Sequence, residues 1–217
     1  MYRPKVVIVE DHAMVREAFQ KLLDPECDVV ACIPDGRALL AAAPALKPDV
    51  ILLDITMPLL NGLDAGDQVK RMMPNTKLIV LTACEDPDFV GEAFRKGAAG
   101  YVLKHCAASE LLYAIREVLC GRTYVTPLLA RNMEGASSLK TQQTKPAEEL
   151  TSRQRQILQL LGEGHSMKTA AGVLGITART VAFHKYRLMQ EFGLRNNADV
   201  VQFAMKHRLI SSVSARR

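Results

Sequence analysis

Acidic, hydroxyl and basic side chains follow several apolar stretches of the sequence, each where the stretch ends. Glu10 and Asp11 follow KVVIV, Asp54 ends VILLD, Thr82 ends KLIVLT, and Lys104 follows YVL. Carboxylates held together repel one another, and hard oxygen ligands suit Mg²⁺, which takes few carboxylates and keeps several waters. An ammonium and a hydroxyl donor suit an anion instead. A phosphoryl group held between the metal, Lys104 and Thr82 satisfies all of them, and Asp54 would then be its nucleophile.

Each of these residues also has an ordinary interpretation when taken alone. A single Asp at a strand end is usually a helix cap or a solvated loop residue, Lys104 could be a surface lysine, and Thr82 a turn residue. The phosphoryl-transfer hypothesis depends on their joint occurrence at successive strand ends.

The apolar stretches and the segments between them predict the elements that would position these side chains. Five strands are expected at residues 5–10, 27–33, 49–54, 77–83 and 99–104, and helices at 12–23, 36–47, 63–73, 86–97 and 108–121. Five βα units in series predict an α/β fold, a doubly wound five-stranded parallel sheet with helices on both faces. Sites in such sheets lie beyond the carboxyl ends of the strands.

A different pattern follows. Residues of about 129–149 are rich in Ser, Thr, Gln, Gly and Pro, which predicts a flexible linker. After it the pattern is helical only, with helices expected at 151–164, 166–175, 177–193 and 197–210 and a helix-turn-helix around LGIT (174–177). We therefore expect a first domain at 1–124, a linker at 125–146 and an all-α four-helix domain at 147–212.

Charge is divided between these two parts. Residues 1–126 carry 14 Lys and Arg against 17 Asp and Glu, a net charge of −3, whereas residues 127–217 carry 14 against 6, a net charge of +8. A basic helical module predicts a polyanionic partner such as DNA. The five cysteines form no CxxC pair, which favours reduced, cytosolic thiols, and no apolar run reaches the ~18 residues of a membrane span.

The first ~122 residues resemble the receiver domain of bacterial two-component response regulators. The resemblance rests on VIVEDHAMVREAF, DVILLDITMPLLNGLDA, VLTA and KGAAGYVLK. It implies a flavodoxin-like fold, Mg²⁺ as cofactor and a sensor histidine kinase as phosphoryl donor. The site residues that it implies are Asp54 as acceptor, Glu10, Asp11, Asp54 and the backbone carbonyl of Thr56 as metal ligands, Thr82 and Lys104 as phosphoryl contacts, and Tyr101 as the switch aromatic.

Residues of about 147–212 resemble the DNA-binding domain of LuxR-type regulators, on LTSRQRQIL, LGIT, RTV and RNNADVVQFA. Joined to a receiver, this is similar to the NarL/FixJ subfamily of transcription regulators. One departure is Ala182, where such proteins often carry Lys. The alternative for Phe183 is core packing, and His184 has no Cys or His partner at metal-ligand spacing. The candidate DNA contacts are Lys168, Thr177, Arg179, Thr180, Ala182, Phe183, His184, Lys185, Tyr186 and Arg187.

Two other functions compete with a phosphorylation-controlled transcription regulator. DIT partly resembles the motif of haloacid dehalogenase hydrolases, but that family needs a second Asp where this chain has Thr56, so we expect no enzyme. A receiver that works only through protein contacts is the other, because Ala182 weakens the DNA module. A helix-turn-helix monomer covers one half-site, so we expect a homodimer, formed through the phosphorylated receiver or residues 197–210.

Overall fold

The computed structural model describes residues 2–83, 85, 87–105, 108–131 and 150–210, with the backbone alone at 87, 88 and 108. The chain divides into an N-terminal and a C-terminal compact unit, which are considered separately. Within the described residues, no helix has the length and apolar character that crossing a membrane requires.

The N-terminal unit is a parallel α/β fold in which strands and helices alternate. Its elements are β1 (Lys5–Val9), α1 (Ala13–Leu23), β2 (Asp28–Ile33), α2 (Gly36–Leu46), β3 (Val50–Asp54), α3 (Gly62–Met72), β4 (Lys77–Thr82), α4 (Pro87–Arg95), β5 (Gly100–Leu103), α5 (Ala108–Leu119) and β6 (Tyr124–Val125).

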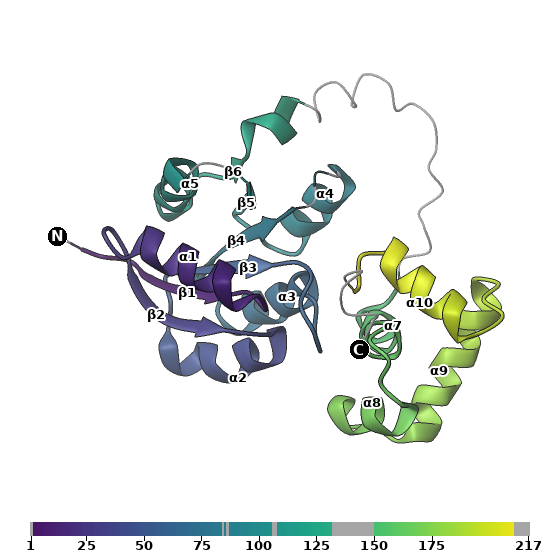
Figure 1. Ribbon diagram of the computed structural model, residues 1–217. Helices are drawn as coiled ribbons and strands as arrows, with labels where there is room; N and C mark the ends of the chain where they lie inside the picture. Colours follow the sequence, from purple (N-terminus) through teal and green to yellow (C-terminus); the bar gives the residue numbers. More distant parts are fainter. Residues whose placement is uncertain (1, 84, 86, 106–107, 132–149, 211–217) are drawn as a thin grey trace. The chain divides into compact units, whose positions relative to one another are not determined.

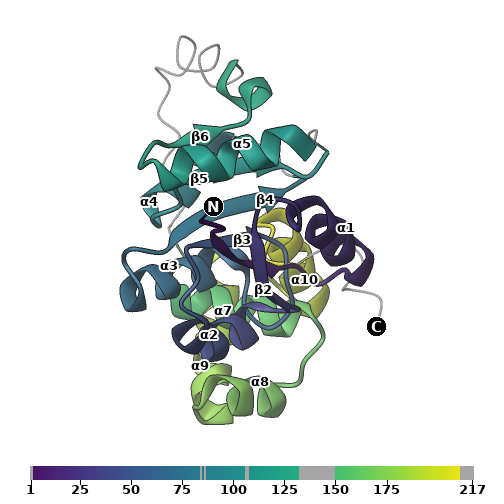
Figure 2. The same cartoon turned by 90° about the vertical axis from the view of Figure 1, so that its left-hand side faces the viewer.

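All strand pairs are parallel, in the order β2-β1-β3-β4-β5-β6, and Figures 1 and 2 show the strands side by side in this order. The order reverses direction between β1 and β3, because the chain first winds toward β2 and then toward β4. Such a switch point opens a crevice beyond the carboxyl ends of the two strands, where sites of open α/β sheets lie. The doubly wound parallel sheet that the sequence predicted is confirmed.

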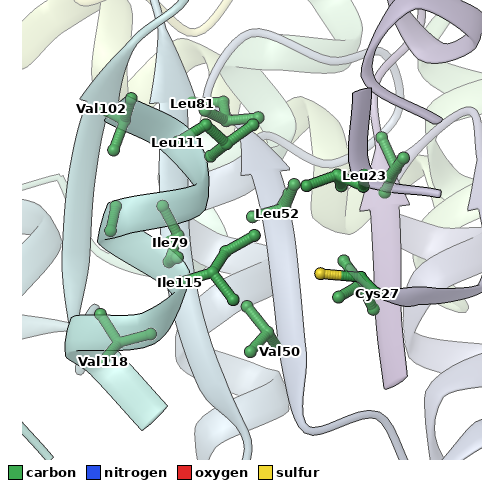
Figure 3. Packing of buried hydrophobic residues seen from close by; sticks show 13 residues of the cluster. Leu23, Cys27, Val50, Leu52, Ile79, Leu81, Val102, Leu111, Ile115 and Val118 are labelled. Atoms are coloured by element: carbon green, nitrogen blue, oxygen red, sulfur yellow. The ribbon is translucent and has the colours of Figure 1, made fainter. Parts of the chain in front are cut away.

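Alternate strand residues pack on opposite faces of the sheet. One face presents Val50, Leu52, Ile79 and Leu81 to α1 and α5, and Figure 3 shows Leu111, Ile115 and Val118 of α5 lying against these strands. The other face packs side chains of β4 and β5 against α3 and α4, in a cluster that includes Val80, Leu63, Val90, Ala93, Tyr101 and Leu103. Both faces are covered, which explains why the strands read as continuous apolar runs.

The prediction of five strands was one short. Tyr124–Val125 forms a sixth strand beside β5, and residues 127–131 are helical. Thr126 lies between them, where its hydroxyl accepts a hydrogen bond from the Leu103 amide at 3.2 Å. Val125, which the sequence placed at the start of a linker, is therefore a strand residue of this sheet.

The C-terminal unit is helical, with α7 (Ser152–Gly162), α8 (Met167–Leu174), α9 (Ala178–Glu191) and α10 (Asn197–Lys206). Thr151 caps α7 in a capping box with Gln154, as its sequence predicted. The last helix ends four residues before the predicted end, because Arg208 adopts a left-handed φ of 52°. The chain turns there and buries Leu209 and Ile210 against the helices.

Candidate functional site

The residues at the carboxyl ends of β1, β3 and β5 continue rows that belong to one face of the sheet. Glu10 extends the row of Val6 and Ile8, Asp54 extends that of Val50 and Leu52, and Lys104 extends that of Val102. These rows face α1 and α5. Pleat alternation alone therefore directs two carboxylates and one ammonium toward the same side of the switch point.

The three side chains meet in ion pairs. The Lys104 Nζ lies 2.6 Å from Glu10 Oε2 and 3.0 Å from Asp54 Oδ2. Glu10 is 2% exposed and Asp54 is 4% exposed. Two carboxylates at this depth need compensation, and a single ammonium shared between them supplies one positive charge for two negative ones.

The pKa values of the three groups reflect this imbalance. Burial raises the pKa of Asp54 to about 6, against the opposing effect of Lys104 and with a further contribution from Glu10. Burial alone would raise the pKa of Glu10, but Lys104 and His12 outweigh it and lower that pKa. Burial alone would lower the pKa of Lys104, which Asp54 and Glu10 raise instead. Of the two carboxylates, Asp54 is therefore the one whose pKa lies above its ordinary value.

Asp11 stands beside this trio and is held by His12. The Nδ1 of His12 lies 2.7 Å from Asp11 Oδ1 and 3.0 Å from Glu10 Oε1. The hydrogen bond to Glu10 and the charge of Asp11 raise the pKa of His12, while burial and the charge of Glu10 raise that of Asp11 despite His12. Glu10, Asp11 and His12 are the one group of three potential metal ligands found among the residues that the structure describes.

The donor set fits Mg²⁺. The carboxylates of Glu10, Asp11 and Asp54 offer hard oxygen atoms at one end of the sheet, which is the kind of ligand that Mg²⁺ prefers. Burial raises the pKa of Asp54, and the charges of Glu10 and Asp11 raise it further, so an additional positive charge near this carboxylate would favour its ionised form. A divalent cation would supply such a charge.

Thr82 and Tyr101 lie on the other face of the sheet. Tyr101 pairs with Val80, packs among Val90 and Leu103 in the α4 cluster and is fully buried. Thr82, at 4% exposure, ends β4 one residue beyond Leu81, the partner of Asp54 in the ladder. The register therefore places Thr82 beside Asp54 at the ends of their strands. Tyr101 lies on the next strand, β5, on the same face as Thr82 but opposite Val80, and so farther from the three charged side chains.

The backbone at Gly62, the first residue of α3, lies close to the backbone of Asp54. The Gly62 amide donates to the Ile55 carbonyl at 2.8 Å, and a Cβ at Gly62 would lie 1.8 Å from the Asp54 carbonyl oxygen. Any larger residue at position 62 would push the end of β3 away, so Gly62 is required for this close approach. Thr56 lies two residues after Asp54, and its role as a carbonyl ligand stays a prediction.

The turn between α8 and α9 has the geometry of a helix-turn-helix. Gly175 ends α8 with a left-handed φ of 65°. Thr177 then caps α9, where its hydroxyl accepts a hydrogen bond from the Thr180 amide at 3.1 Å. Val181 and Leu188 are buried and fix the inner side of α9.

The outer side of α9 presents two aromatic and two basic side chains at helical spacing. Phe183 is 61% exposed and Tyr186 60% exposed, while Arg179 and Arg187 are also exposed. Positions 179, 183, 186 and 187 share one helical face. We call these four residues the α9 outer face. The core-packing alternative for Phe183 is wrong.

The other candidate DNA contacts differ in exposure and in the contacts that their side chains make. Lys168 and Thr177 are exposed, while the Lys185 Nζ donates to Asn197 Oδ1 at 2.7 Å, so Lys185 ties α9 to the start of α10. The Phe183 and His184 rings meet edge to face at 5.6 Å. Thr180 and Ala182 are half-buried.

We call the group of Glu10, Asp11 and Asp54 at the carboxyl ends of the strands the acidic corner. Two residues that bond to it were not singled out from the sequence. His12 bonds both members of the acidic pair, and Arg16 donates to the carbonyl oxygens of Glu10 and Asp11. His12 follows the acidic pair directly, and Arg16 follows His12 by one helical turn. Their spacing could therefore have indicated from the sequence that both residues lie near the acidic pair.

Known proteins are similar to this chain in both parts. Residues 6–116 match the family described as response regulator receiver domain, and residues 148–204 match that described as bacterial regulatory proteins, luxR family. Response regulator GacA of Pseudomonas aeruginosa is 31% identical over 212 residues, 97% of this chain and 99% of GacA. Oxygen regulatory protein NreC of Staphylococcus aureus is 35% identical over 214 residues, 95% of this chain and 99% of NreC.

Solved structures show the same folds. The RcsB response regulator of Salmonella typhimurium matches with a TM-score of 0.67 at 24% identity, covering 95% of this chain and 98% of RcsB. The receiver domain of the putative response regulator NarL from Mycobacterium tuberculosis matches with a TM-score of 0.54 at 31% identity, covering 56% of this chain and all of that domain.

Proposed function

The chain belongs to the response regulators that join a receiver to a LuxR-type domain, which are phosphorylation-controlled DNA-binding transcription regulators, and we propose that Asp54 is the residue that accepts the phosphoryl group. The observation that carries this proposal is the position of Asp54, buried at the switch point with the Lys104 Nζ 3.0 Å from its Oδ2. Burial also raises the pKa of Asp54 to about 6, so a cation beside this carboxylate would stabilise its nucleophilic, ionised form.

The transfer follows from this geometry. A carboxylate oxygen of Asp54 attacks the phosphorus of a phosphohistidine on the partner kinase, so an Asp54 O–P bond forms as the histidine N–P bond breaks. The Lys104 ammonium, 3.0 Å from Asp54 Oδ2, would contact an oxygen of the incoming phosphoryl group, and Thr82 at the end of the adjacent strand would offer its hydroxyl. Bound Mg²⁺, held by Glu10, Asp11, Asp54 and the Thr56 carbonyl, would neutralise charge on the phosphoryl oxygens.

The response is proposed to run through the opposite face of the sheet. A phosphoryl group on Asp54 attracts the Thr82 hydroxyl, and Tyr101, on the neighbouring strand and the same face of the sheet as Thr82, adjusts to the change. Because Tyr101 packs against α4 side chains, the surface formed by α4, β5 and α5 changes shape.

The α9 outer face is proposed to enter the major groove of DNA. Arg179 and Arg187 supply charge for phosphates, and Phe183 and Tyr186 supply apolar area for base edges such as the thymine methyl. Two copies of the chain would then occupy two half-sites, so a homodimer is the proposed DNA-binding form. We propose that the protein acts in the cytoplasm, where its DNA partner would be.

Hydrolysis of small phosphate esters is the alternative for Asp54. The family is not a class of enzymes, and the acid–base Asp that such hydrolases need is replaced by Thr56. We propose that the phosphoryl group on Asp54 is a signal and that the chain does not turn over esters.

Phosphotransfer tests the proposal directly. The full chain is incubated with acetyl phosphate and Mg²⁺, and its intact mass is measured. We expect one phosphoryl adduct, which the Asp54→Asn variant lacks and the surface variant Asp67→Asn retains. An adduct that persists in Asp54→Asn would exclude Asp54 as the acceptor, and steady product release from a generic ester would favour the hydrolase.

A further inference from the structure

Arg16 reaches back from the first turns of α1 to the end of β1. Its Nη1 lies 2.5 Å from the Glu10 carbonyl oxygen and 3.0 Å from the Asp11 carbonyl oxygen. One nitrogen thus bonds two successive carbonyls of the segment that carries the acidic pair. The bonds go to the backbone rather than to the carboxylates.

Backbone bonds also hold both ends of the segment between β1 and α1, and at the helix end the Arg16 amide donates to the His12 carbonyl at 3.0 Å. The Glu10 amide donates to the Ile33 carbonyl at 3.0 Å, which holds the side of the segment toward β2. His12, the N-cap of α1, makes no side-chain capping bond, and the first turn of α1 has no acidic residue. The carboxylates themselves are bonded by His12 and, for Glu10, also by Lys104. The two bonds from Arg16 act on the backbone instead: they fix the carbonyls of Glu10 and Asp11 and so help to set the direction in which both side chains leave the chain.

We propose that Arg16 is a positioning residue for the metal-binding carboxylates of Glu10 and Asp11. The inference rests on the proposed function of the acidic corner. A guanidinium is suited to this role because its donors are planar and fixed, so that it defines the orientation of the carbonyls that it bonds. Partners of this kind, which hold ligands rather than the metal, affect affinity by roughly 10–100-fold when removed.

The test is a metal titration of the full chain. Mn²⁺ serves as a paramagnetic probe and Mg²⁺ displaces it, which yields the Kd of Mg²⁺ without any phosphoryl donor. For Arg16→Met, which keeps the aliphatic stem but loses the donors, we expect a Kd of Mg²⁺ raised by roughly 10-fold. Arg16→Lys keeps one point donor and should give an intermediate Kd.

Two controls separate positioning from a general effect on the helix. Lys21→Met removes a positive charge from the last turn of the same helix and should leave the Kd of Mg²⁺ unchanged. Saturating Mg²⁺ should restore the phosphorylation rate of Arg16→Met toward that of the unmodified chain. A purely structural role would lower the Tm of both Arg16 variants while leaving the Kd unchanged.

An unchanged Kd in Arg16→Lys and Arg16→Met overturns the inference, whatever happens to the Tm. If Arg16→Met does not fold, the Kd of Arg16→Lys decides alone. The proposed function fails separately, if the unmodified chain neither binds Mg²⁺ nor accepts a phosphoryl group.

Discussion

At the scale of single residues, Asp54 is held at a cost to stability. Its folded pKa of about 6 exceeds the ordinary value of 3.8, so the folded chain binds a proton more tightly than the unfolded chain. The free energy of unfolding therefore falls as pH rises from about 4 to about 6 and then levels off. At 1.36 kcal/mol for each pKa unit, the full effect is roughly 3 kcal/mol.

We predict that Asp54→Asn stabilises the metal-free protein at pH 8 by about 1–3 kcal/mol, because the amide has no charge to bury. The gain should shrink toward zero at pH 4, where Asp54 is protonated. Denaturant unfolding in the presence of a chelator at both pH values measures this gain in stability. The control is Asp67→Asn, which removes an ion pair with Arg71 on the surface of α3. An equal effect at the two pH values would show that charge is not the cause.

His207 makes the opposite contribution to pH dependence in the C-terminal unit. Its ring lies 4.2 Å from that of Phe203, and burial, Lys206 and Arg155 lower its pKa. The folded chain therefore binds a proton at His207 less tightly than the unfolded chain, so the stability that this group contributes is complete above pH 6.5 and is lost as pH falls below that value. We predict that His207→Gln flattens the fall in stability between pH 7 and 5, measured by denaturant unfolding. Lys206→Met should weaken the pH dependence only in part.

At the scale of elements, the segment after α5 belongs to the sheet. Leu129 is fully buried and packs in the cluster that contains Tyr101, while Leu128 is 46% exposed. We predict that Leu129→Ala lowers the free energy of unfolding of the N-terminal unit by about 2–4 kcal/mol. The neighbour Leu128→Ala should change it by less than about 0.5 kcal/mol. Thermal unfolding compares the two, and equal effects would contradict the packing of residues 127–131.

The same segment shows where sequence patterns stop being sufficient. The five long strands and their helices were predictable, because apolar runs and caps specify them locally. A two-residue strand has no period to detect, and Tyr124–Val125 is a strand only because β5 offers it an edge to pair with. In the acidic corner, the residues were predictable because they stand at strand ends. The bonds from Arg16 to two carbonyls were not, because they depend on the path of the chain between β1 and α1, which the bond from the Glu10 amide to the Ile33 carbonyl helps to fix.

At the scale of the whole molecule, charge separates the two tasks. The sequence shows a net charge of −3 over residues 1–126 and +8 over residues 127–217. The acidic part carries the carboxylates proposed to hold a divalent cation, and the basic part carries the DNA-binding domain. Affinity for DNA should accordingly fall steeply with salt, through release of counterions from the phosphates that Lys and Arg contact.

The α9 outer face divides this affinity into two components that single substitutions separate. We predict that Arg187→Gln weakens binding to all sequences and lowers the slope of log Kd against log salt concentration by about one, because one phosphate contact is lost. Phe183→Ala should leave that slope unchanged and reduce the preference for specific over random DNA by roughly 1–3 kcal/mol. Fluorescence anisotropy on a selected genomic fragment and on random duplex, each over a range of salt concentrations, measures both quantities. If Phe183→Ala weakens both duplexes equally, Phe183 contributes general affinity rather than base recognition, and the proposed insertion of this face into the major groove loses its support.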